Sequence, residues 1–171
     1  GIWNKYSAPA WGSKATTNIN YEMNYWPALT TNLEECFVPF VEKAKALTIS
    51  GSKTAMTQYG IDKGWVLHHN TDLWRLTTPV GARRRGYGFC FLPVARGWFI
   101  RHIWEYYEYT QDLDWLREEG WPVIKKAAEF YRFTLVEDRD GSLIMAPSTS
   151  PENCFIAEDN SVSAISASAT M

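Results

Sequence analysis

Apolar residues in the first third of the chain recur at intervals of three and four, which places them on one face of a helix. Members of this repeat are Leu33, Cys36, Phe37, Phe40, Val41, Ala44 and Leu47. Thr31 and Glu34 have the spacing of a capping box, which predicts the start of the helix. Gly51 is expected to end it, and residues 52–59 predict a second, shorter helix that Gly60 closes.

The same spacing returns in the second half of the chain. Residues 98–110 predict a third helix, and residues 112–118 predict one or two further turns. Pro122 is placed to open another helix, because proline fits the first helical turn. Only residues 142–146, after the Asp140-Gly141 turn, predict an extended segment. The pattern therefore predicts an all-α chain of about four or five helices with long connecting loops.

Composition restricts the partners that this chain can bind. The 171 residues are 46% hydrophobic, which suits a folded core, and 17 basic against 19 acidic residues give a net charge of −2. This balance offers no patch for nucleic acid or for an anionic membrane, and no apolar run of about 18 residues predicts a membrane span. Cys36, Cys90 and Cys154 form neither a metal-binding signature nor a disulfide framework. Aromatic residues make up 15% of the chain, which fits a large aromatic core or stacking on sugar rings.

Three polar segments lie on the connections between the predicted helices. Residues 18–27 read Asn-Ile-Asn-Tyr-Glu-Met-Asn-Tyr-Trp-Pro, residues 68–74 read His-His-Asn-Thr-Asp-Leu-Trp, and residues 148–153 read Ser-Thr-Ser-Pro-Glu-Asn. They are rich in amides, carboxylates, hydroxyls and indoles, the groups that hydrogen-bond and stack on carbohydrates. A rigid helical scaffold can present such connections into one cavity.

In this order, the three segments resemble the catalytic domain of glycoside hydrolase family 95, over essentially the whole chain. The resemblance implies an (α/α)6 toroid and an inverting α-L-fucosidase that uses no cofactor or metal and acts on a fucosylated oligosaccharide or polysaccharide. Residues 1–171 would be the N-terminal portion of that domain, truncated at both ends and inactive alone. Apolar side chains of such a piece would be exposed, namely Phe37, Phe40, Ile103 and Leu135. A secreted or periplasmic parent protein fits this activity.

Hydrolysis of a glycosidic bond requires an acid that protonates the leaving oxygen and a base that activates water. Glu152 is the candidate acid, and the resemblance assigns it this role; as an alternative, Glu152 caps a helix that Pro151 opens. The resemblance also implies that Asn18 and Asn20 orient the water for a base carboxylate beyond Met171. In an extended segment their amides would lie on one side, about 6 to 7 Å apart. The alternative for this pair is Asx-turns within a loop.

The histidine segment has three interpretations. Adjacent histidines point in different directions and His102 is isolated, which argues against a metal site. We expect instead a wall of the sugar site, with Trp74 or Trp65 packing on an apolar sugar face. The candidate substrate-binding residues are His68, His69, Asn70, Asp72, Trp74 and Asn153. Alternatively, the histidines and Asp72 only hold a long loop through local hydrogen bonds.

The sequence is also compatible with two other functions, and one segment of it is atypical of the family. An inverting glycoside phosphorylase would need basic residues around the water site, where only Lys14 and Arg75 lie near the motifs. A catalytically silent carbohydrate-binding protein would tolerate loss of Glu152. The sequence does not distinguish fucose from L-galactose as the sugar, because one side chain of the pocket can decide between them. Residues 83–96 depart from the family pattern, through a divergent loop or a local sequence error.

Overall fold

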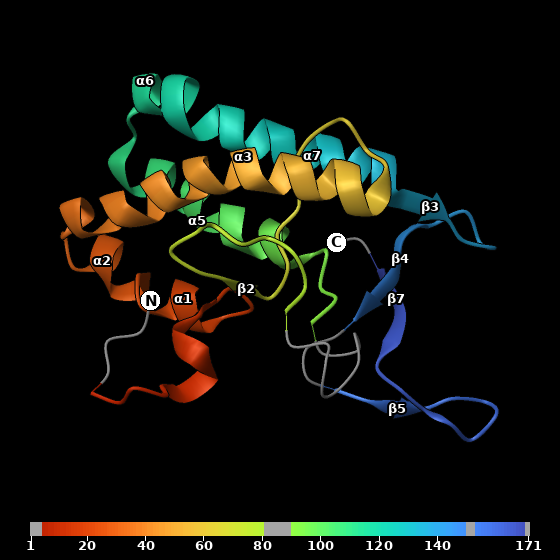
Figure 1. Cartoon of the computed structure of the whole chain (residues 1–171). Helices are drawn as coiled ribbons and strands as arrows, with labels where there is room; N and C mark the ends of the chain where they lie inside the picture. The colour runs from red at the N-terminus through yellow and green to blue at the C-terminus, as the bar shows by residue number, and fades with distance from the viewer. Residues whose placement is uncertain (1–4, 81–89, 150–152, 170–171) are drawn as a thin grey trace.

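The computed structural model describes residues 5–80, 90–149 and 153–169. The three longest elements of this part of the chain are helices: α3 (Val38–Tyr59), α5 (Ala95–Thr110) and α7 (Trp121–Thr134). Figure 1 shows them packed along one another, and both α3 and α5 contact α7. Shorter elements precede and connect them, namely η1 (Ala10–Ser13), α1 (Asn20–Met23), α2 (Trp26–Thr30), η2 (Glu34–Phe37), α6 (Leu113–Trp115) and η4 (Leu116–Gly120).

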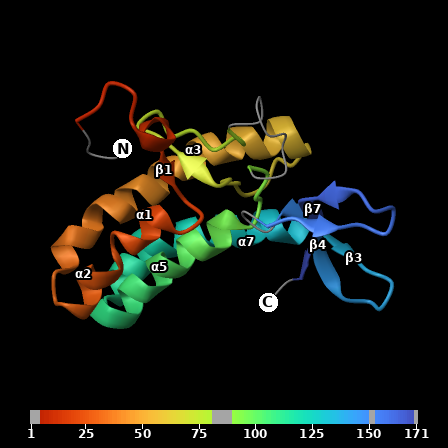
Figure 2. The same cartoon turned by 90° about the horizontal axis from the view of Figure 1, so that it is seen from below.

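Strands accompany the helices, so the prediction of an all-α chain is wrong. The described residues form three antiparallel sheets with the strand orders β1-β2, β3-β4-β7 and β5-β6. Their bounds are β1 (Ala15–Thr16), β2 (Asn70–Thr71), β3 (Leu135–Glu137), β4 (Leu143–Thr149), β5 (Phe155–Ile156), β6 (Val162–Ser163) and β7 (Ile165–Ala169). The three-stranded sheet extends beyond the end of α7, as Figure 2 shows from below. Residues 142–146 were predicted as extended, and β4 confirms this and continues to Thr149.

Helix α3 corrects two predictions made around Gly51 and Thr31. It continues through Gly51 to Tyr59 and ends at Gly60, which has a φ of 68°. Gly51 is instead a packing position, because a Cβ there would lie 2.6 Å from the carbonyl oxygen of Val66. Thr31 does not cap this helix, since its hydroxyl donates to the carbonyl of Pro27 at 2.7 Å and α3 begins only at Val38.

The helices enclose an aromatic core. Phe37, Phe40 and Ile103 are at most 1% exposed, which overturns the expectation that this chain leaves them on the surface. Leu135, the fourth residue of that set, is half-buried. Phe40 stacks on Phe99 with ring centroids 4.4 Å apart. Much of the high aromatic content therefore fills the core, where each such side chain removes a large apolar area from water.

Candidate active site

The two-stranded ribbon β1-β2 joins the first two sequence motifs. Thr16 lies opposite Asn70 in this antiparallel pair. Thr17 extends the pairing, because its backbone N–H donates to the carbonyl of His69 at 2.7 Å. Asn18, the next residue, therefore lies beside the histidine pair although the two segments are far apart in the sequence.

The two asparagines of the first motif have different surroundings. Asn18 is 9% exposed, and its side-chain oxygen has no hydrogen-bond partner among the described residues. Asn20 is exposed and begins α1. The segment is not extended as expected, since the N–H of Met23 donates to the carbonyl of Ile19 at 2.9 Å and closes a helical turn. The turn places one amide inside the protein and the other at its surface.

His68 is held on both ring nitrogens. Nδ1 lies 2.7 Å from the carbonyl oxygen of Thr77, and Nε2 lies 2.8 Å from the hydroxyl of Tyr59. The side chain is fully buried, and burial lowers the pKa of His68 to about 4. His68 is therefore a neutral, hydrogen-bonded residue of the interior, as in the loop-holding alternative.

The backbone at residues 90 and 91 connects the second motif to the third. Nδ1 of His69 lies 3.1 Å from the carbonyl oxygen of Cys90. The hydroxyl of Thr149, at the end of β4, donates to the carbonyl of Phe91 at 2.5 Å. The beginning of the Ser148 to Asn153 motif thus lies close to the histidine segment, and through it to Asn18.

Other polar side chains near the ribbon are buried without partners. Asn70 is 5% exposed and Thr71 is fully buried, and neither the Asn70 side-chain oxygen nor the Thr71 hydroxyl bonds to another described residue. Ser148, fully buried, also has an unpartnered hydroxyl. Buried polar atoms are rarely left unbonded in folded proteins, so these atoms are available to hydrogen-bond a water or a ligand.

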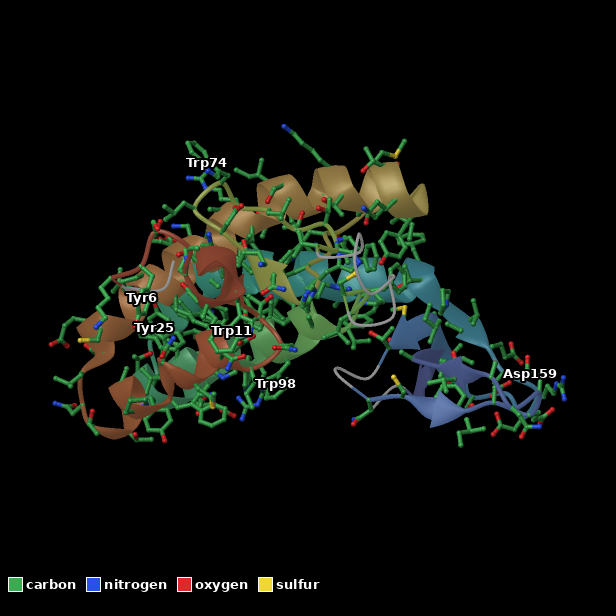
Figure 3. All side chains as sticks on the ribbon, turned by 60° about the horizontal axis from the view of Figure 1, so that its bottom comes forward. Tyr6, Trp11, Tyr25, Trp74, Trp98 and Asp159 are labelled. Atoms are coloured by element: carbon green, nitrogen blue, oxygen red, sulfur yellow. The ribbon has the colours of Figure 1, made fainter. Side chains whose placement is uncertain are left out.

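The end of the histidine segment is a tight turn at the surface. The N–H of Leu76 donates to Oδ1 of Asp72 at 3.0 Å, and the ammonium group of Lys43 donates to the Asp72 carbonyl. These are the local bonds of the loop-holding alternative. Trp74 is 89% exposed on this turn and lies far from Trp98 in Figure 3.

The other residues that the sequence indicated lie in the core, at the surface or outside the described residues. Trp65 is fully buried in the core, and its indole N–H donates to the carbonyl of Val123 at 3.2 Å, so it is not a sugar platform. Asn153 is exposed. Glu152 and the Arg83-Arg84-Arg85 run lie outside the described residues. The structure therefore relates the third motif to the other two through Ser148 and Thr149.

Two buried charged residues were missed by the sequence analysis. Glu22 is fully buried in α1, neither carboxylate oxygen has a partner among the described residues, and burial raises its pKa to about 7. Arg96 is also fully buried, with its guanidinium carbon 3.7 Å from the ring centre of Tyr131. The only sequence signal for Glu22 was that it is the single carboxylate of the first motif, residues 18–27, which does not by itself indicate burial.

We predict that His68 makes the folded protein sensitive to acid. The unfolded chain protonates His68 near its usual pKa of about 6.5, whereas the folded protein does so only near 4. Stability from neutral His68 is thus fully present above about pH 6.5 and is lost as the pH falls toward 4. The loss should reach about 3 kcal/mol. Urea denaturation at a series of pH values measures it.

His68→Gln is the reference variant for this prediction, because glutamine keeps polar atoms but does not titrate in this range. Glu22 contributes the opposite slope, since its raised pKa removes stability as the pH rises from about 4.5 to 7. The prediction therefore concerns the difference in the free energy of unfolding between the parent and His68→Gln at each pH. An identical pH slope in both proteins would contradict the buried neutral state of His68.

In the part of the chain that the structure describes, no three His, Cys, Asp or Glu side chains come together to hold a metal ion. Within that part, no helix is both long and apolar enough to cross a membrane. The polar atoms near β1-β2 are instead amide, hydroxyl and carboxyl oxygens.

Residues 1–171 match the family described as the glycosyl hydrolase family 95 catalytic domain. The chain belongs to this family. The match to family 95 covers all three motifs, including the residues at 150–152.

Named relatives are similar to this family 95 chain. Alpha-L-fucosidase 2 of Arabidopsis thaliana is 39% identical over 172 residues, which is 100% of this chain and 20% of the relative. Probable alpha-fucosidase A of Aspergillus niger is 34% identical over 157 residues, covering 90% of this chain and 19% of the relative. Kojibiose hydrolase of Flavobacterium johnsoniae is 54% identical over 81 residues, 43% of this chain and 10% of the relative. The chain thus spans about a fifth of the length of the two fucosidase relatives.

Proposed function

We propose that the full-length protein hydrolyses terminal α-L-fucosyl or α-L-galactosyl linkages with inversion of configuration. The observation that carries this proposal is the meeting of the motifs: Thr17 bonds to His69, His69 to the carbonyl of Cys90, and Thr149 to the neighbouring carbonyl of Phe91. Family membership and the fucosidase names of two relatives support the substrate class.

In this mechanism Glu152 is the general acid. It delivers a proton to the leaving oxygen as positive charge develops on the sugar ring. Asn18 and Asn20 orient the attacking water, since amides hold water through hydrogen bonds but are too weakly basic to take its proton. The proton passes to a carboxylate that lies beyond residue 171.

The remaining candidate residues take supporting roles. We assign His69, Asn70 and Asn153 to contacts with sugar hydroxyls, because amide and imidazole groups both donate and accept hydrogen bonds. Trp74 contributes an exposed indole that can stack on a more distant sugar of a longer glycan. His68 and Asp72, whose hydrogen bonds lie within the chain, hold the segment that carries these groups.

The proposal is tested with the full-length protein and three substrates: an aryl α-L-fucoside, the matching α-L-galactoside and kojibiose. We expect hydrolysis of the first two, with the β anomer appearing first by NMR. Release of the α anomer first would contradict the water-activation scheme. Cleavage of kojibiose alone would replace fucose by glucose as the substrate. Sugar release that depends on inorganic phosphate and yields a sugar phosphate would indicate a phosphorylase.

Water positioning gives a separate prediction for the two asparagines. Asn18→Gly and Asn20→Gly should each lower kcat by roughly 10²-fold while KM changes little, because the position of the water matters chiefly in the transition state. Steady-state kinetics of the full-length variants measure this split. The exposed Asn24→Gly in the same motif is the control and should keep the parental kcat. A rise in KM at constant kcat would instead make the asparagines substrate-binding groups.

A further inference from the structure

The ribbon β1-β2 and helix α1 carry a set of buried hydrogen-bond acceptors that have no donor among the described residues. The unpartnered atoms are Oδ1 of Asn18, both carboxylate oxygens of Glu22, Oδ1 of Asn70 and Oγ1 of Thr71. All four residues are at most 9% exposed. Native proteins leave few buried polar atoms unbonded, so a concentration of them on adjacent elements needs a cause.

The chemistry of these atoms defines the missing partner. Amide and carboxylate oxygens accept hydrogen bonds, and a hydroxyl oxygen can accept as well, so a group that donates hydrogen bonds matches this set. Within the described residues, no lysine or arginine forms an ion pair with Glu22. A neutral ligand with several O–H groups matches this set of acceptors better than an anion does.

Glu22 stands out because burial of an unpaired carboxylate is unfavourable for the protein. An isolated carboxylate loses its hydration on burial, and the raised pKa near 7 reflects that loss. A helical turn separates Glu22 from Asn18, since α1 begins two residues after Asn18. The carboxyl group therefore belongs to the same structural unit as the proposed water-orienting amides.

We propose that Glu22 is a further substrate-binding residue, whose carboxyl group accepts a hydrogen bond from one hydroxyl of the bound sugar. This inference rests on the proposed function, because it takes the sugar site to lie at the ribbon β1-β2. In this arrangement the ligand hydroxyl satisfies an acceptor that the folded chain leaves unbonded. The protein keeps the carboxyl group despite its cost to stability, as binding sites commonly do.

The test combines stability with kinetics in the full-length Glu22→Leu variant. Leucine has a similar size and no polar atom, so removal of an unpaired buried carboxyl group should raise the melting temperature at pH 8. The same variant should raise KM for an aryl α-L-fucoside by roughly 10- to 100-fold, because the sugar hydroxyl loses its acceptor. Glu22→Gln retains an acceptor oxygen and should recover most of the affinity.

Deoxy substrates identify the hydroxyl. With the parent, removal of the contacted hydroxyl should weaken binding, whereas the Glu22→Leu variant should show no further loss for that one substrate. Thr54→Val is the control, since its buried hydroxyl already has a partner, Thr77, at 2.6 Å. This control should lose stability and keep the parental KM.

Three results would overturn the inference. The first is a parental KM in a Glu22→Leu variant that is more stable than the parent, and the second is a parental KM in one that is less stable. The third is a deoxy series in which no single hydroxyl loses its effect on binding when Glu22 is replaced by leucine. If Glu22→Leu does not fold, the inference is tested by comparing the binding of the deoxy substrates to the parent and to Glu22→Gln. A parent that cleaves no fucoside refutes the proposed function instead. Thermal shifts with L-fucose, L-galactose and D-glucose then test Glu22 alone, and equal shifts in parent and Glu22→Leu would count against it.

Discussion

Glu152→Gln in the full-length protein is expected to lower kcat for natural fucosides by roughly 10²- to 10⁴-fold, the usual contribution of a general acid. Glutamine has nearly the same shape as glutamate but carries no transferable proton. Sugar binding, measured by calorimetry with a non-hydrolysed fucoside, should stay close to that of the parent. The loss should shrink for aryl fucosides with acidic leaving groups, because these depart with little protonation.

The dependence on the leaving group separates an acid from a structural residue. The alternative in which Glu152 caps a helix is wrong, because residues 153–154 are irregular and β5 begins at Phe155. If Glu152 had only a structural role, its substitution would change stability and would affect all substrates equally. Glu158→Gln is a matched control, since Glu158 is an exposed carboxylate a few residues further along the chain. Parental rates for natural fucosides in Glu152→Gln would show that another group supplies the proton.

Gly64→Ala is expected to reduce the free energy of unfolding by about 2 to 5 kcal/mol. Gly64 has a φ of +72°, where a side chain costs roughly 1–2 kcal/mol. An added Cβ would also lie 2.3 Å from the carbonyl oxygen of Lys126 and 2.5 Å from the backbone nitrogen of Phe130. These are backbone atoms of α7, so relief requires the connection after α3 to move away from the helix, at a further cost of about 1–3 kcal/mol.

Gly60→Ala isolates the first of these effects, the cost of a side chain at positive φ. Gly60 has a similar φ of +68°, but a Cβ there would meet nothing within 4 Å. We therefore expect Gly60→Ala to cost only the conformational part, roughly 1–2 kcal/mol. Guanidinium denaturation of both variants provides the comparison. Equal losses would mean that α7 does not approach Gly64 as closely as described.

Helices with a strong apolar repeat were predictable, and strands of small residues were not. The third helix was predicted at 98–110 and is observed at Ala95–Thr110, and Pro122 lies in the first turn of α7 as expected. Strand β7 was not predicted, because its alternation of Ile, Ser and Ala carries little hydrophobic contrast. The helix does not end at Gly51 as expected. Glycine is needed there for close packing against Val66, and only the tertiary structure reveals this contact.

The location of the motifs was partly accessible from the sequence. Residue types indicated which segments are polar, but not that Asn18 is buried while Asn20 is exposed, because that depends on the helical turn at Ile19. The engagement of both His68 nitrogens also required Tyr59 and Thr77, which lie outside the motifs. Glu22 was overlooked because the burial of a carboxyl group depends on the elements around it.

The contacts at residues 90 and 91 affect how freely the amino acids at these positions can be substituted. His69 and Thr149 both bond to main-chain carbonyls there, which every amino acid provides. Substitutions that preserve the path of the backbone and the size of the buried side chains would therefore leave both bonds intact. Residues 90 and 91 can therefore be replaced while the neighbouring motifs stay in register.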